Sequence, residues 1–126
     1  MAITNAGAIL AAQCLMNNSA TFLDSSNAHL GVGDSSTAFA AAQTDLQAAT
    51  NKVRKAMDAS YPTRSSGALT FRSTYSASEA NFAWAEWGVF NASSSGTMFS
   101  RKVESLGTKT NTQTWVLTAT VTVAAA

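Results

Sequence analysis

The residue best placed to do chemistry is Glu86, which lies between two tryptophans in the apolar stretch ANFAWAEWGVFNA over residues 80–92. A carboxylate in an apolar pocket can act as a general acid with a raised pKa, but it needs a second acid or base nearby, and none is evident in the sequence. An unpaired buried charge is costly. We therefore expect Glu86 to be a structural buried carboxylate, held by backbone donors or by an arginine, with Arg72 and Arg101 as the candidates.

Other patterns that could support catalysis or metal binding are weak. His29 is the only histidine, and Asp24 and Asp34 lie near it in no recognised metal-ligand spacing. The GVGDSS segment lacks the further glycine or the Gly-Lys-Ser/Thr of a nucleotide loop, so it is expected to form a turn. Cys14 is the only cysteine and is expected to be a buried, inert thiol. We expect no catalytic residue, no cofactor and no metal, and hence no enzyme.

Composition narrows the range of partners. The 126 residues fit one domain, and eight basic against seven acidic side chains leave the chain nearly neutral, so nucleic acid and anionic membranes are not expected partners. Only 12% of residues are charged, while Ser, Thr, Ala and Asn are plentiful, which suits a protein packed in an assembly. The apolar start has no preceding basic residue and is interrupted at Gln13, so we expect neither a signal peptide nor a membrane span and synthesis in the cytoplasm.

The first half of the chain predicts one helix and one short strand. Residues 4–17 have apolar residues at helical spacing after Thr4 or Asn5, either of which can cap a helix. A short strand is expected over 29–32. Residues 44–58 are ambiguous, because a capping-box pattern favours a helix whereas KVRKAMDASY also alternates as a strand. The sequence alone leans to helix there.

The second half predicts a β-sheet. Four stretches alternate with period two or are rich in β-forming residues: 68–75, 82–90, 97–106 and 114–123. The loop NASSSG suits a hairpin connection. We expect a mainly β fold, an antiparallel β-sandwich with a short N-terminal helical segment, in which residues 1–20 form the helical or arm segment and 21–126 a single β-sandwich domain.

The stretch 82–90 has more apolar side chains than one small core needs. Strict alternation places Trp84 with Glu86 and Phe90 on one face, and Trp87 with Val89 on the other. The N-terminal helix likewise has more apolar residues than one side can bury. We therefore expect an interface with other subunits, formed by Ile3, Ile9, Leu10, Met16, Trp87 and Val89. The basic cluster Lys52, Arg54 and Lys55 is expected to be a solvated face.

The order of several short motifs resembles a known module. A G-x-G turn at Gly31 and Gly33 is followed by Thr44 with Leu46, a basic stretch at 52–55, Glu86 with Gly88 and Phe90, a G-T-M turn at 96–98, and Lys109. Over residues 27–123 this order resembles a module of small structural proteins of tailed bacteriophages and prophages. More distantly, it resembles the N-terminal domain of phage tail-collar fibre proteins.

The resemblance implies a non-enzymatic β-rich module that assembles on a virion, often as a homotrimer. It favours a strand over 52–61 and supplies no catalytic or metal residues. Tail fibres carry a long shaft after this module, and none follows here. We therefore expect above all a capsid decoration, or cement, protein that binds the major capsid protein on the outer shell and ties capsomers together. The alternatives are a tail, baseplate or tail-fibre attachment component and, from another class, a small hydrolase or carbohydrate-binding module that uses Glu86 and the tryptophans.

Overall fold

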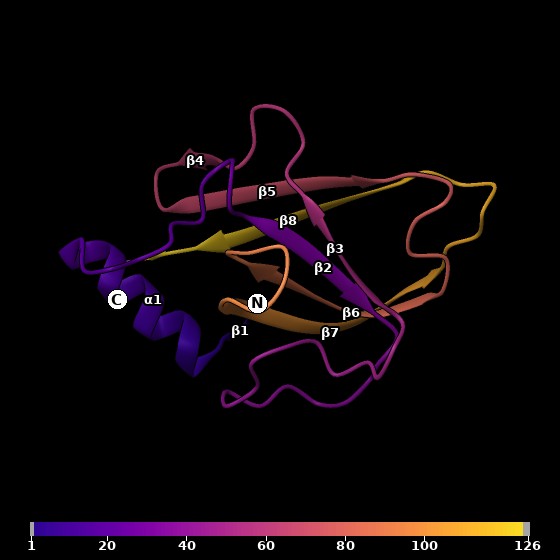
Figure 1. The fold of residues 1–126 in the computed structure, drawn as a ribbon, viewed down its shortest axis with the longest axis horizontal. Coiled ribbons are helices and arrows are strands. Elements are labelled where there is room, and N and C mark those ends of the chain that lie inside the picture. Colours follow the sequence, from indigo (N-terminus) through magenta and orange to yellow (C-terminus); the bar gives the residue numbers. More distant parts are fainter. Residues whose placement is uncertain (1, 125–126) are drawn as a thin grey trace.

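The computed structural model describes residues 2–124 and shows a mainly β chain with one short helix (Figure 1). Residue 1, at the start of the segment predicted over 1–20, and residues 125–126, at the end of the domain predicted over 21–126, lie outside the described residues. The elements, in chain order, are β1 (Ala2–Ile3), α1 (Asn5–Met16), β2 (His29–Gly33), β3 (Lys52–Ala56), β4 (Thr63–Ser65), β5 (Ala68–Tyr75), β6 (Ala83–Phe90), β7 (Met98–Thr108) and β8 (Trp115–Thr122).

Two antiparallel sheets form a sandwich-like arrangement, which confirms the predicted fold class. The larger sheet has the order β1-β7-β6-β2-β3 and the smaller sheet the order β4-β5-β8. Between them, Trp84 packs edge-to-face on Tyr75 and on Trp115, with ring centroids 4.9 Å apart in both pairs. The four strands predicted in the second half of the chain are present, with ends within two residues of the predicted ones.

The N-terminal helix forms where its capping residue predicts. Thr4 accepts a hydrogen bond from the Gly7 amide at 2.8 Å, and the helix ends at Asn17 in the left-handed conformation, with φ of 50°. Gly7 lets α1 approach β7 closely, since a Cβ there would lie 2.1 Å from the Phe99 carbonyl oxygen. Leu10 adds to the main core. The segment expected over 1–20 thus shares its packing with the domain expected over 21–126.

The lean toward helix over residues 44–58 is wrong. The segment begins as part of an irregular loop, residues 34–51, and continues into strand β3. Leu46 and Ala48 are buried while Gln47 between them is exposed, which is the alternation of an extended chain. The amides of Gln47 and Ala48 bond to a side chain of the large sheet, so a long-range contact overrides the local capping signal.

The predicted facing of β6 is also wrong at one point. The pairing of β6 with β7 shifts register between Trp84 and Glu86, and this irregularity interrupts the period-two alternation. Trp84 and Trp87 therefore both belong to the core between the sheets, whereas sequence alternation placed them on opposite faces. Trp87 is 7% exposed and Val89 is fully buried. Both were expected in a subunit interface, and the structure places both in the core of the single chain.

Candidate functional site

The fully buried carboxylate of Glu86 sits on the outer face of the large sheet. Its Oε1 lies 2.8 Å from Nε of Arg101, and neither side chain has any exposed surface. The same carboxylate accepts hydrogen bonds from the backbone amides of Gln47 and Ala48, both at 2.8 Å. Of the two candidate arginines, Arg101 is the partner because it lies on β7 beside β6, whereas Arg72 lies on the other sheet and pairs with Asp58.

The Glu86–Arg101 pair holds the loop of residues 34–51 onto the large sheet. Arg101 also donates to the Thr37 carbonyl oxygen at 2.9 Å and to the Gln43 side-chain oxygen at 3.1 Å. Gly33 makes room for the carboxylate, since a Cβ there would lie 2.4 Å from Glu86 Oε2. The hydrogen bonds of both charged groups run to this loop and to each other, so the arrangement stabilises the fold.

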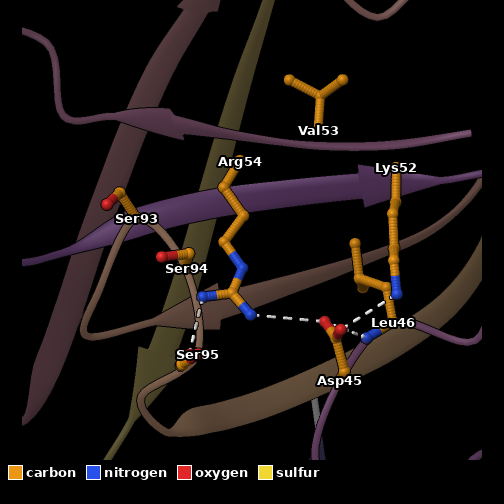
Figure 2. Close-up of a pocket in the computed structure, with 8 residues that line it drawn as sticks. All are labelled: Asp45, Leu46, Lys52, Val53, Arg54, Ser93, Ser94 and Ser95. Carbon is orange, nitrogen blue, oxygen red and sulfur yellow. Dashed lines mark hydrogen bonds and ion pairs between the residues drawn. The ribbon is translucent and has the colours of Figure 1, made fainter.

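The basic cluster is paired, and Figure 2 shows two of its members around a pocket of about 250 Å³. Arg54 donates to the Ser95 carbonyl oxygen at 2.8 Å, lies 3.4 Å from a carboxylate oxygen of Asp45, and stacks 3.7 Å from the centre of the Phe90 ring. Lys52 pairs with the other oxygen of Asp45 at 3.0 Å. The two cations therefore share one carboxylate, and Arg54 also holds the 93–95 loop, rather than forming a free anion site.

Carboxylates beside these cations have pKa values below their usual range. Partial burial raises the pKa of Asp45, but the hydrogen bonds from Lys52 and from the Leu46 amide, together with the nearby positive charges, lower it by more. Hydrogen bonds from Lys55 and from the Ser76 amide lower the pKa of Glu79 to about 2. Both carboxylates therefore stay ionised across the physiological pH range, as partners of the basic cluster.

The remaining polar candidates also have structural contacts. His29 Nδ1 lies 2.8 Å from the Asn27 carbonyl oxygen, and Asp24 accepts from the backbone of the following turn. Lys109, the last residue of the motif order, is buried and donates to the Ser76 carbonyl oxygen at 2.6 Å and to Asn81 at 2.8 Å. Within residues 2–124, no three His, Cys, Asp or Glu side chains come together as a metal site would require. No helix in that same range has the length and apolar content to span a bilayer.

The exposed apolar side chains form the more distinctive surface. On α1, Leu15 is 89% exposed, Met16 76% and Ile9 61%. Of the residues expected in an interface, Ile9 and Met16 are thus exposed and Ile3 partly so, while Leu10 is buried in the chain's own core. Leu15 was not among the expected interface residues. Its exposure follows from helix geometry, because Leu10 and Cys14 turn toward the body of the protein and Leu15 then points away from it.

A groove of about 330 Å³ lies beside the helix, and its lining is almost wholly apolar. Leu15 and Cys14 of α1 form one wall, and Phe99 of β7 with Leu69 of β5 form the other. Sequence analysis did not find this groove, because its walls come from residues more than fifty positions apart. The free thiol of Cys14 is partly buried at its edge.

Comparisons with protein-family models, with curated protein sequences and with solved structures found no match for this chain.

Proposed function

We propose that the chain is a non-enzymatic structural protein of a tailed bacteriophage virion, and specifically a capsid decoration protein that binds the outer shell and joins neighbouring capsomers. The observation that carries the proposal is the exposed apolar surface of α1, formed by Ile9, Leu15 and Met16, on a compact β-rich body. The order of motifs from Gly31 to Lys109, which resembles phage structural modules, supplies the kind of particle.

The helix is suited to a contact that excludes water. Its sequence, NAGAILAAQCLM, contains no charged residue, so no ion has to be desolvated when the surface is covered. Complete burial of a leucine, isoleucine or methionine side chain is worth about 1.5–3 kcal/mol. Three such side chains on one short helix can therefore contribute much of the contact made by one copy, and repeated copies on a shell add avidity.

The polar groups of the chain support a structural role in a different way. The buried pair of Glu86 and Arg101 is bonded to the loop that covers it, and the cations of the basic cluster are paired with carboxylates. In an enzyme we would expect at least one titratable group in a cleft to be free for a substrate. The arrangement fits a module whose interior charges hold a loop in place and whose contacts are made through apolar surface.

The test is binding to phage shells that lack the protein. Purified wild type should coat the capsid in many copies, as seen by electron microscopy. I9S/M16S should lower the binding affinity by about tenfold or more, the loss expected for about 1.4 kcal/mol or more of buried apolar contact. The matched control A8S/A12S, also on the exposed side of α1, should bind as wild type does.

Both variants should melt at the wild-type temperature, so that a loss of binding reports the surface and not the fold. Copies found only at the tail would overturn the decoration role and favour the tail component. An I9S/M16S variant that binds shells as tightly as wild type would remove α1 from the contact.

A further inference from the structure

The free edge of β8 differs from the other sheet edges in the described part of the chain. Exposed edges are normally blunted by shortness, charge or proline, because unpaired backbone groups invite another strand. β1 has two residues, β4 has three and includes Arg64, and β3 carries Lys52, Arg54 and Lys55. β8 has eight residues, and no charged residue or proline occurs anywhere from Thr110 to the C-terminus.

The backbone of β8 has a strand partner on one side. Within residues 2–124 it pairs only with β5, and Figure 1 shows the two strands side by side. The Val123 amide donates to the Gly67 carbonyl oxygen, so the odd-numbered residues point their backbone groups toward β5. The amides and carbonyls of Val116, Thr118, Thr120 and Thr122 then point outward from the sheet edge.

We propose that this edge pairs with the same edge of a second copy of the chain, in an antiparallel, two-fold-symmetric arrangement centred on Ala119. That register places Thr118 beside Thr120 of the second copy and Val116 beside Thr122 of the second copy. The outward backbone groups of both strands then bond to one another along the strand. The inference goes beyond attachment to a virion, since it concerns how copies join each other.

The side chains of β8 favour a second copy over an unrelated strand. In this register the odd-numbered residues of both strands share one face, so Leu117 lies beside Val121 of the second copy and the apolar inner face continues. The threonines share the outer face, where Thr–Thr pairs across strands are favourable. Symmetric pairing brings like residues into proximity, and β8 has no charge that could repel its copy.

A groove next to the edge gives the second copy a site with both apolar and polar lining. It has a volume of about 510 Å³, and its lining combines Trp84, Trp87, Leu106 and Trp115 with Glu104, Thr114 and Thr118. The proposed register places Val123 of the second copy beside Trp115, at this groove. Val116, which is 56% exposed, and Val123, which is 65% exposed, both lose solvent contact in the pairing. The interface is therefore isologous, with each copy supplying both an edge and a groove.

Two matched variants test the register. In T118E/T120E, every close pair across the two-fold axis brings two carboxylates together, whereas in T118E/T120K every such pair joins a carboxylate to an ammonium group. Within one copy, both variants place the same glutamate opposite Arg72 and differ only at position 120. By sedimentation equilibrium at low salt, wild type and T118E/T120K should form dimers. The dissociation constant of the T118E/T120E dimer should be at least about tenfold higher.

Amide hydrogen exchange gives a second measurement on the unmodified chain. The amides of Thr118 and Thr120 should become protected as protein concentration rises, while the Leu117 amide, which points toward β5, should be protected at every concentration. A wild type that stays monomeric at millimolar concentration, that forms only trimers, or whose Thr118 and Thr120 exchange does not depend on concentration would overturn the pairing. T118E/T120E should still bind shells through α1, so this inference and the proposed function can fail separately.

Discussion

Two regions of the molecule differ in which side chains they cover: one buries a pair of charged side chains, and the other leaves apolar side chains exposed. On the outer face of the large sheet, a glutamate and an arginine are buried completely, and the 34–51 loop closes over them with matching hydrogen bonds. On the side that carries α1 and β8, uncharged and apolar groups are left uncovered. The charged region is closed and the apolar region is open. The buried charge therefore belongs to the fold, and the uncovered apolar surface is where a partner is to be sought.

The strongest way to break the closed region is to remove one member of the ion pair. Arg101→Met leaves the Glu86 carboxylate buried with only its two backbone donors. We expect a loss of about 3–5 kcal/mol in the free energy of unfolding, because an uncompensated buried charge remains. Urea denaturation measures this loss, and E86Q/R101M should recover part of it. A loss below 1 kcal/mol would show that water reaches the pair and that the loop does not seal it.

The second prediction concerns the boundary between the two regions. Trp87 belongs to the core but also lines the groove beside β8. Trp87→Ser should cost about 3 kcal/mol, the lower end of the range for truncating a buried tryptophan, because one side of the ring faces the groove. Val116→Ser is the control, since Val116 lines the same groove but is largely exposed, and its cost should stay within about 0.5 kcal/mol. Equal melting temperatures for the two variants would mean that Trp87 is an interface residue after all.

The third prediction tests how the open side is anchored to the sheets. Thr4 is buried, caps α1, and donates to the Met98 carbonyl oxygen at 2.6 Å. Thr4→Ala removes both hydrogen bonds and should lower stability by about 1–2 kcal/mol, whereas Thr4→Ser keeps the hydroxyl and should lose much less. Thermal melts of the two variants give the comparison. Similar losses would point to the methyl group, and not the cap, as the stabilising part.

Sequence reasoning succeeded where the signal was local. The alternation of residues 68–75 and 114–123 predicted β5 and β8 because each strand has one face in the core and one in solvent. The start of α1 was also predicted from a local signal, a capping residue at Thr4 or Asn5, and Thr4 is the cap. The lean toward helix over 44–58 failed in its first part because the conformation around Gln47 and Ala48 depends on Glu86, about forty residues away. Local patterns carry no information about such a partner.

The candidate surface was predicted in part for a related reason. Apolar excess on α1 correctly suggested that some side chains stay exposed, but the choice among Ile9, Leu10 and Met16 depended on which face packs on β7. The same excess on β6 was taken as a second interface. The irregularity after Trp84 instead lets Trp84, Trp87 and Val89 lie together in the core. The free edge of β8 is a property of sheet order, which a single strand's sequence does not contain.

The smallest predicted effect comes from an ion pair that is not closed off from water. Lys55 and Glu79 lie 2.8 Å apart, and their side chains are 36% and 29% exposed. Glu79 titrates with a pKa of about 2 in the folded chain, against an ordinary value of 4.5. Since the folded pKa is the lower one, ionised Glu79 stabilises the fold fully above about pH 4.5, and this contribution is lost as the pH falls toward 2.

Solvent screening keeps that contribution small, at about 0.2–1 kcal/mol for an exposed pair. Glu79→Gln should therefore be slightly less stable than wild type at pH 7 and equal to it near pH 2, as measured by urea denaturation at several pH values. In 1 M salt the difference at pH 7 should shrink, because the pair is exposed, whereas the loss caused by Arg101→Met should persist. A Glu79→Gln effect that resists salt and is as large as that of Arg101→Met would contradict the comparison. It would mean that the Lys55–Glu79 pair is as well shielded from water as the Glu86–Arg101 pair.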